Sequence, residues 1–309
     1  MLFEKAIIIR DKTRLEQLID RFNSKAQARF YIERNGGDFD FYEAEHETFY
    51  KSLETVKSGT ATCLKYKILD RSFLSTYLFS SIDLIIVLGQ DGLVANTAKY
   101  VCGQPIVAVN PDPEKYDGIL LPYHPDHIIQ VINYITKYKN YKIRQITMAE
   151  ARLSDNQRML AFNDFYIGCS SHVSSRYSIM FDGKREEQSS SGIIISTGAG
   201  STGWLSSIFN MVHNVNISSQ SITEANHLKI DWESNKLIFV VREPFKSHIT
   251  QTDLGYGIIT KNKPLVISSS ITKGGVIFSD GVEADFLSFN SGSTAHIGIA
   301  KEKANLVVA

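Results

Sequence analysis

The chain has few cysteines, no net charge and no long apolar run. Its 309 residues include three cysteines, and 33 basic side chains balance 33 acidic ones. Cys63, Cys102 and Cys169 lie far apart and form no Cys-x-x-Cys pair, which is typical of a reducing compartment rather than a disulfide-linked secreted protein. A balanced charge provides no overall field that would attract nucleic acid or an anionic membrane. We therefore expect neither as a partner.

The amino-terminal segment does not show the apolar pattern of a secretory signal. Glu4, Lys5, Arg10 and Asp11 interrupt its apolar residues, so it contains no secretory apolar region, and nothing in the chain approaches the length of a membrane span. These absences lead us to expect a cytoplasmic protein.

The first half of the chain alternates short apolar runs with helical patterns. We predict helices over residues 13–26 and 45–59, and strands over the runs 5–10, 28–33, 82–89 and 104–110. Such alternation is typical of βαβ units and a parallel sheet. The run from Ile82 to Leu88 is nearly all apolar, as expected of a central strand that is covered on both faces.

From about Arg144 the pattern changes to short strands separated by turns. We predict strands within residues 161–168, 177–187, 191–197, 236–244, 264–270 and 275–289. Asp182-Gly183 and Asp280-Gly281 stand where hairpin turns are expected, and Lys184 to Glu187 form a solvated hairpin arm. One helix over 203–215 is followed by a Ser-rich exposed loop at 216–227. We therefore predict an α/β domain over 1–143 and a mainly antiparallel β domain over 144–309.

A glycine-rich turn, Gly198-Ala-Gly200-Ser-Thr-Gly203, matches the pattern G-x-G-x-x-G. It is not a Rossmann turn, because the first acidic residue after it is Glu224 in the loop and the segments that follow are antiparallel. No lysine follows the glycines, which excludes a Walker loop. The turn still offers backbone N–H groups and the hydroxyls of Thr197, Ser201 and Thr202 to a phosphate or a ribose. The alternative is a plain strand-to-helix turn with Ser201 or Thr202 as helix cap.

A second turn, Gly89-Gln90-Asp91-Gly92, follows the predicted central strand. Open α/β sheets bind ligands at the carboxyl ends of their strands, and an Asp there can act as general base in phosphoryl transfer. The alternative is an ordinary Asp-Gly turn. Gly36-Gly37-Asp38 is interpreted as a connection, and His124 and His127 as exposed loop residues rather than a metal site.

Five motifs occur in an order that resembles the NAD kinase family, most closely its mitochondrial-type branch and bacterial relatives. They are GQDG at 89–92, VNPDPEKYDGIL at 109–120, AFND at 161–164, SSGIIISTGAGSTGW at 190–204 and VREP at 241–244. The resemblance spans roughly residues 5 to 300.

The resemblance implies a kinase that phosphorylates the 2′-hydroxyl of the adenosine ribose of NAD, making NADP. It implies ATP or polyphosphate as donor and Mg²⁺ or another divalent metal as cofactor. The implied fold is an amino-terminal Rossmann-like α/β domain with a parallel sheet and a carboxyl-terminal β-sandwich domain. In the family the active site lies between the domains and is completed by oligomer contacts, so the resemblance implies a homodimer or homotetramer.

Carried onto this sequence, the resemblance makes Asp91 the catalytic residue. The residues implied to bind substrate or nucleotide are Gly89, Gln90, Gly92, Asn110, Asn163, Asp164, Thr197, Gly198, Gly200, Ser201, Thr202, Trp204 and Ser207. Without the family, Asn163 and Asp164 would be interpreted as a turn or strand end, and Trp204 as a core residue beside an amphipathic helix.

The first motif departs from the family's usual Gly-Gly-Asp-Gly-Thr at two positions. Gln90 replaces a glycine, and we expect it to need a positive φ, while Leu93 replaces a threonine and removes a hydroxyl. Ser191 replaces an acidic residue, as in the mitochondrial-type branch. Two alternatives to an active NAD kinase follow, namely a sensor that binds NAD(H) or NADP(H) with weak or no catalysis, and a kinase of another hydroxyl substrate.

Overall fold

The computed structural model of the chain describes residues 3–101, 103–139, 141–218 and 230–308. The chain divides into two compact units, one of residues Met1–Arg144 with Asn305–Ala309 and one of residues Gln145–Ala304. Cys102 and most of the predicted loop at 216–227 lie outside the described residues. Cys63 and Cys169 are free thiols.

The first unit, unit 1, is built on a parallel sheet with strand order β2-β1-β3-β4. Its strands and helices are β1 (Lys5–Arg10), α1 (Arg14–Phe22), α2 (Lys25–Arg34), α3 (Phe39–Ala61), β2 (Lys65–Asp70), β3 (Asp83–Leu88), α4 (Asp91–Ala98), β4 (Pro105–Val109) and α5 (Ile128–Asn133). Asn305 and Leu306, near the end of strand β16 (Thr294–Val308), pair in parallel with β4. The α/β fold predicted for this part of the chain is confirmed.

The central strand β3 is buried along its whole length, as its apolar sequence predicts. Its neighbours are β1 and β4. Leu53 and Val56 of α3 and Val131 of α5 share one hydrophobic core with Leu84 and Ile86 of this strand. Both helices therefore cover the same face of the sheet.

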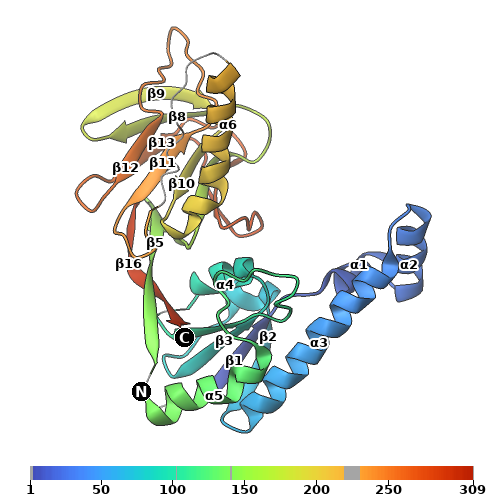
Figure 1. The fold of residues 1–309 in the computed structure, drawn as a ribbon. Coiled ribbons are helices and arrows are strands. Elements are labelled where there is room, and N and C mark those ends of the chain that lie inside the picture. The colour runs from blue at the N-terminus through green and yellow to red at the C-terminus, as the bar shows by residue number, and fades with distance from the viewer. Residues whose placement is uncertain (1–2, 102, 140, 219–229, 309) are drawn as a thin grey trace. The chain divides into compact units, whose positions relative to one another are not determined.

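Helices α1 and α2 pack against the amino-terminal part of α3 and form a small separate core around Leu15, Ala28 and Phe39. We call α1, α2 and residues Phe39–Tyr50 of α3 the helical arm. Figure 1 shows α1 and α2 in dark blue beside the amino-terminal end of the long helix α3.

The strand predicted over residues 28–33 is wrong, because this run lies within α2. The Ser24 hydroxyl caps this helix by accepting a hydrogen bond from the N–H of Gln27 (3.2 Å). The run buries only Ala28, while Phe30 and Tyr31 are exposed, so it does not show the alternation of a half-buried strand. Strand β2 was not predicted, since it lies at the sheet edge and its first three residues are exposed and mostly polar.

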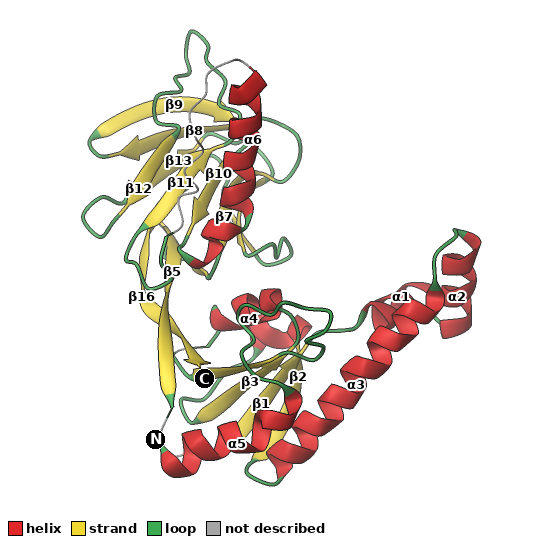
Figure 2. Ribbon diagram, viewed as in Figure 1, coloured by secondary structure: helices red, strands yellow, loops and turns green. Residues whose placement is uncertain are grey.

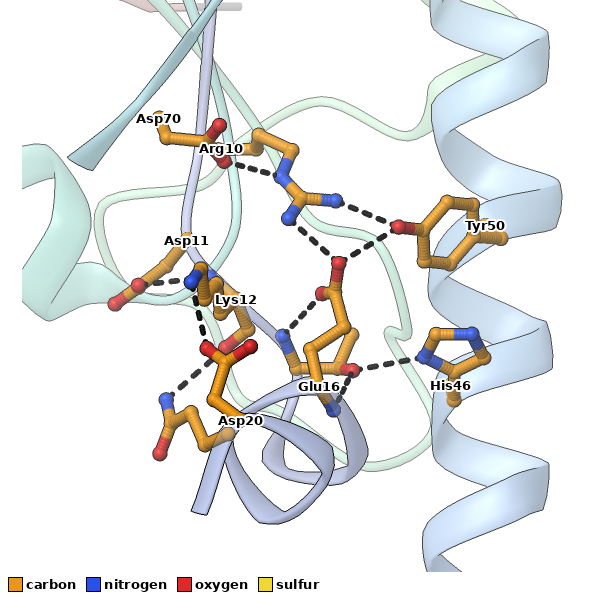
Figure 3. A network of polar contacts seen from close by, with 10 residues as sticks. Arg10, Asp11, Lys12, Glu16, Asp20, His46, Tyr50 and Asp70 are labelled. Atoms are coloured by element: carbon orange, nitrogen blue, oxygen red, sulfur yellow. Dashed lines mark hydrogen bonds and ion pairs between the residues drawn. The ribbon is translucent and has the colours of Figure 1, made fainter. Parts of the chain in front are cut away.

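A polar network ties the arm to the sheet (Figure 3). The Arg10 guanidinium at the end of β1 donates to Asp70 of β2 (2.7 Å), to the Tyr50 hydroxyl of α3 (2.9 Å) and to Glu16 of α1 (2.8 Å). Tyr50 donates to the same Glu16 oxygen (2.7 Å), and the other Glu16 oxygen accepts from the N–H of Thr13 (2.8 Å). Because Glu16 accepts hydrogen bonds from Arg10, Tyr50 and the Thr13 N–H, it fixes the orientation of α1.

We expect Glu16→Gln to lower the free energy of unfolding at pH 7 by about 2 kcal/mol. Burial alone would raise the pKa of the Glu16 carboxyl, but hydrogen bonds from Arg10, the Thr13 N–H and Tyr50 outweigh it and lower the pKa. A carboxyl with a lowered pKa stabilises the fold above its unfolded pKa of about 4.3 and loses this contribution as the pH falls through the folded value. The difference from wild type should therefore shrink below about pH 4.

Urea unfolding at pH 7, 5 and 3.5 measures this dependence. Glu33→Gln is the matched control, because Glu33 lies on the same arm with an exposed side chain and a pair at 4.0 Å to Arg29. A Glu16→Gln effect that is the same at all three values of pH would contradict the role assigned to its charge.

The second unit, unit 2, is a sandwich of two sheets (Figure 2). Its further elements are β5 (Lys142–Leu153), β6 (Arg158–Ala161), β7 (Asp164–Cys169), β8 (Ser175–Phe181), β9 (Lys184–Ser190), β10 (Ile193–Ser196), α6 (Trp204–Ser218), β11 (Leu237–Val241), β12 (Tyr256–Ile259), β13 (Leu265–Ser269), β14 (Gly275–Ser279) and β15 (Phe286–Ser288). One sheet has the order β16-β13-β8-β9, with β5 and β6 attached through β16, and the other has the order β12-β11-β10-β7-β14-β15.

The two sheets bury their inner faces against each other. Tyr177 and Ile267 of one sheet share a core with Ile193, Phe239 and Ile277 of the other. Strands β7 to β15 pair antiparallel with their neighbours in these sheets, so the predicted β-sandwich is confirmed. Helix α6 covers the outer face of the second sheet, where its Ile208 packs with Ile194 and Val276.

Both predicted Asp-Gly turns form. Asp182 and Gly183 join β8 to β9 with φ of 51° and 78°, and Asp280 and Gly281 follow β14 with φ of 52° and 70°. Asp tolerates this left-handed conformation better than most residues, and Gly adopts it freely. In the described part of the chain no helix has both the length and the apolar character needed to span a bilayer.

Candidate functional site

The turn at residues 89–92 lies at the carboxyl edge of the parallel sheet, between the end of β3 at Leu88 and the start of α4 at Asp91. Gln90 has φ −99° and ψ 168°, the extended backbone of a helix N-cap. The expectation of a positive φ at Gln90 is therefore wrong, because capping a helix does not require left-handed backbone. A side chain at this position is compatible with the turn.

Asp91 connects the start of α4 to the loop that follows β4. Its carboxylate oxygens accept hydrogen bonds from the backbone N–H groups of Leu120 (2.8 Å) and Ile119 (3.3 Å). Each bond uses one acceptor position on its oxygen, and an ionised carboxylate has about four. Asp91 therefore retains the capacity to accept a further proton or hydrogen bond.

Asn110 shapes this loop from inside. Its side chain is buried, donates to the carbonyl of Tyr116 (2.9 Å) and accepts from the N–H of Asp112 (3.0 Å). Gly118, with φ of 58°, lies against the amide, since a Cβ there would be 2.6 Å from Nδ2 of Asn110. These contacts order the loop whose next residues donate to Asp91.

A cavity of about 600 Å³ borders the turn. Gly89, Gln90, Gly92 and Leu93 line it from the turn and the start of α4. Its charged lining consists of the cations Lys12, Arg14, Arg71 and Lys115 and the carboxylates Asp11, Glu45 and Asp112. A cavity with four cations beside a strand-end turn suits a phosphorylated ligand.

The same lining is compatible with a divalent ion that arrives with its ligand. Among the described residues there is no group of three or more His, Cys, Asp or Glu side chains that could hold a metal. Mg²⁺ does not need such a group, because it is commonly bound by one or two carboxylates together with substrate phosphates. Asp11 and Asp112 are the carboxylates that suit this role, and both line the cavity; Asp11 would exchange its ion pair with Arg71 (2.8 Å) for the metal.

In unit 2 the structure brings the pair Asn163-Asp164 and the glycine-rich turn together. Thr197 is fully buried and donates its hydroxyl to the carbonyl of Phe162 (2.6 Å), while its N–H donates to the carbonyl of Asn163 (2.9 Å). The same hydroxyl accepts from the N–H of Gly200 (3.2 Å). Thr197 therefore joins the two motifs through its hydrogen bonds.

The glycines of the turn are required by close backbone packing. A Cβ on Gly198 would lie 2.2 Å from the carbonyl oxygen of Asp231, and a Cβ on Gly200 would lie 2.1 Å from that of Asn163. Both distances are far below van der Waals contact, so a side chain at either position would displace the neighbouring backbone. The glycine pattern thus has an explanation that does not involve a ligand.

The hydroxyls after the glycines differ in their surroundings. Ser201 is buried and donates to the carbonyl of Gly198 (2.7 Å), so it does not cap α6. Thr202 is exposed at the end of the 3₁₀ segment Ala199–Thr202, and the exposed Ser207 donates to the carbonyl of Gly203 (3.4 Å). Thr202 and Ser207 are therefore the hydroxyls most accessible to a ligand.

Trp204 lies at a second cavity, of about 720 Å³, on the outer face of the β7, β10 and β14 sheet. Its ring is stacked on Tyr166, with 6.1 Å between centroids and 10° between planes, and the Arg242 guanidinium lies 5.5 Å from it. Ser191, also at this cavity, donates its hydroxyl to Glu243. Trp204 is partly buried, so it serves the packing of α6 while one part of the ring remains accessible.

Sequence reasoning missed the role of Asp280. Its carboxylate accepts from the backbone N–H groups of Phe162 (3.1 Å), Asn163 (2.6 Å) and Asp164 (3.2 Å), and its own N–H donates to the carbonyl of Asp164 (3.0 Å). Charge-assisted bonds of this kind are the stronger ones. Asp280 therefore holds the backbone of the Asn163-Asp164 pair, although the sequence indicates only a turn.

No family model matches the sequence, and no curated protein matches it. Solved structures, in contrast, match the fold over nearly the whole chain. Yeast NADH kinase complexed with NADH matches with a TM-score of 0.61 at 12% identity, over 99% of this chain and 84% of the yeast chain. An NAD kinase from Archaeoglobus fulgidus in complex with ATP matches with a TM-score of 0.55 at 12% identity, over 98% of this chain and 92% of the other. The chain therefore has the fold of these NAD(H) kinase structures.

Proposed function

We propose that this protein is an NAD kinase, which transfers the γ-phosphoryl group of ATP to the 2′-hydroxyl of the adenosine ribose of NAD. The observation that carries the proposal is the position of Asp91 in a strand-end turn whose neighbouring residues Gly89, Gln90 and Gly92 line a cavity with four cations and three carboxylates. The fold, in addition, matches an NADH kinase and an NAD kinase. The five sequence motifs support the same activity.

The proposed reaction is a direct in-line displacement. The 2′-oxygen of NAD attacks the γ-phosphorus, the bond from that phosphorus to the bridging oxygen of ADP breaks, and the hydroxyl proton passes to the Asp91 carboxylate. A bound Mg²⁺ would neutralise charge on the donor phosphates, with Asp11 and Asp112 as its candidate protein ligands. The N–H groups of residues 119 and 120 orient the Asp91 carboxylate through their hydrogen bonds.

The proposed acceptor site lies on unit 2. Asn163 and Asp164 belong to the backbone segment that Asp280 holds, and an amide with a carboxylate suits the hydroxyls of a ribose. Thr202 and Ser207 offer exposed hydroxyls, and the accessible part of Trp204 offers a surface for adenine. We further propose, from the family resemblance, a cytoplasmic homodimer or homotetramer.

Purified full-length protein incubated with NAD, ATP and Mg²⁺ tests the proposal. We expect NADP and ADP to form in equal amounts, as measured by chromatography, with no ADP formed when NAD is left out. Parallel reactions with NADH as acceptor and polyphosphate as donor identify the preferred substrates. Binding of NAD in a titration, with no product from any acceptor and donor pair, would contradict the kinase and favour a sensor. ADP formed without NADP in the presence of another alcohol would point to a different acceptor.

A further inference from the structure

The cavity in unit 1 is assembled from segments that follow four parallel strands. The lining residues are 11–14 after β1, Arg71 after β2, Gly89, Gln90, Gly92 and Leu93 after β3, and Pro111, Asp112, Lys115 and Tyr116 after β4. Parallel strands end at the same edge of their sheet, and this edge is where open α/β sheets bind ligands. The helical arm adds Phe41 and Glu45 to the same cavity.

Two cations of this cavity share one carboxylate of the arm. Arg14 donates to both oxygens of Glu45, with 3.1 Å from Nε to each, and Lys115 donates to Oε2 of the same side chain. The Glu45 side chain is 11% exposed, whereas Arg14 is 47% exposed and Lys115 is 27% exposed. The cluster therefore has one positive charge in excess, and its cations remain accessible from the cavity.

The electrostatics of Glu45 agree with this arrangement. Burial by itself would raise the pKa of its carboxyl, but the hydrogen bonds from Arg14 and Lys115 outweigh burial and hold the pKa below its ordinary value. Glu45 is thus ionised at neutral pH and acts as a fixed counter-ion.

Both cations also lie close to the aromatic ring of Phe41. The Arg14 guanidinium carbon is 4.9 Å and the Lys115 ammonium is 4.2 Å from the ring centroid, and the ring is 46% exposed. An exposed aromatic ring with flanking cations can stack on a base while the cations contact phosphates.

We propose that the helical arm forms part of the phosphoryl-donor site, in which Arg14 and Lys115 bind the donor phosphates in place of Glu45 and Phe41 stacks on the nucleobase. This inference rests on the proposed kinase function and assigns its donor to the cavity of unit 1. The turn at 89–92 supplies the other side of the site, since Gly89, Gln90 and Gly92 line the same cavity. Glu45 competes with the phosphates, so it limits the affinity of the site.

The test measures binding of Mg-ATP and of inorganic tripolyphosphate to full-length protein by calorimetry, with no acceptor present, next to the KM values for ATP and NAD. We expect Arg14→Gln and Lys115→Gln each to weaken both ligands about tenfold while the KM for NAD stays unchanged. Glu45→Gln should tighten both ligands about threefold, because it removes a competing charge. Phe41→Leu should weaken ATP about fivefold and leave tripolyphosphate unchanged.

The arm offers matched controls outside the cavity. Arg29 pairs with Glu43 on α3 as Arg14 pairs with Glu45, but neither Arg29 nor Glu43 lines the cavity, so Arg29→Gln and Glu43→Gln should leave binding unchanged. Equal effects of Arg14→Gln and Arg29→Gln would overturn the proposal, and so would weaker binding in Glu45→Gln. Binding is measured without acceptor, so the two proposals can fail separately. Binding that depends on Arg14, with no NADP formed, would contradict the kinase function and leave the role of the arm in binding ATP intact. NADP formation with an unchanged ATP affinity in all variants would contradict the role of the arm in the donor site and leave the kinase function intact.

Discussion

Asp91→Asn is expected to lower kcat for NADP formation by about 10³-fold, because an amide cannot take the proton of the attacking hydroxyl. The KM values for NAD and ATP should change little, since the substitution keeps the size and the acceptor oxygen of the side chain. Initial rates over a range of both substrates, with product measured by chromatography, give the three constants.

The expected loss of kcat in Asp91→Asn should not come from misfolding. An Asn at this position can still accept the shorter bond from the N–H of Leu120 (2.8 Å) through its carbonyl oxygen, and it loses mainly the longer bond from Ile119 (3.3 Å). We expect a stability loss of about 1 kcal/mol, measured by urea unfolding. The matched control is Asp117→Asn, which changes an exposed carboxylate two residues before Ile119 and should retain wild-type kcat. A kcat for Asp91→Asn within a factor of ten of wild type would show that Asp91 is not the base.

The parts of the fold that depend on local pattern could be predicted from the sequence. The apolar run of β3, the helix at 204–218 and the Asp-Gly turn between β8 and β9 each follow from periodicity or turn chemistry within a few residues. The strand predicted at 28–33 was wrong. The apolar residues of this run suit a strand, but the Ser24 cap and the packing of Ala28 place it in a helix. Tertiary packing overrides propensity in such short segments.

The candidate site could be predicted only where its residues stand within motifs. Asp91 is visible in the sequence because it follows a strand with glycines on both sides. The contacts of Arg14 and Lys115 with Glu45 join residues 31 and 70 positions apart. No local pattern indicates such pairs, and in the sequence these charges are indistinguishable from a solvated surface. The same holds for Asp280, which lies more than a hundred positions from the backbone it holds.

Asp280→Ala is expected to raise the KM for NAD about tenfold or more, while the KM for ATP stays unchanged, because Asp280 positions the Asn163-Asp164 pair of the proposed acceptor site. It should also lower the free energy of unfolding by about 3 kcal/mol, since three backbone N–H groups lose a charged acceptor. Steady-state kinetics and urea unfolding of the same preparation measure both effects.

Two variants separate positioning from a general loss of stability. Asp182→Ala removes an Asp with nearly the same backbone, φ 51° against 52°, whose carboxylate pairs only with the exposed Lys263 among the described residues. It carries the same backbone cost of a positive φ, so it should lower stability slightly and leave the KM for NAD unchanged. Asp280→Asn keeps the oxygen that accepts from Asn163 and Asp164, and Asn tolerates the left-handed backbone, so it should recover most of the affinity for NAD. If Asp280→Ala lowered stability without changing the KM for NAD, Asp280 would be a structural residue of the turn and not a positioning residue of the site.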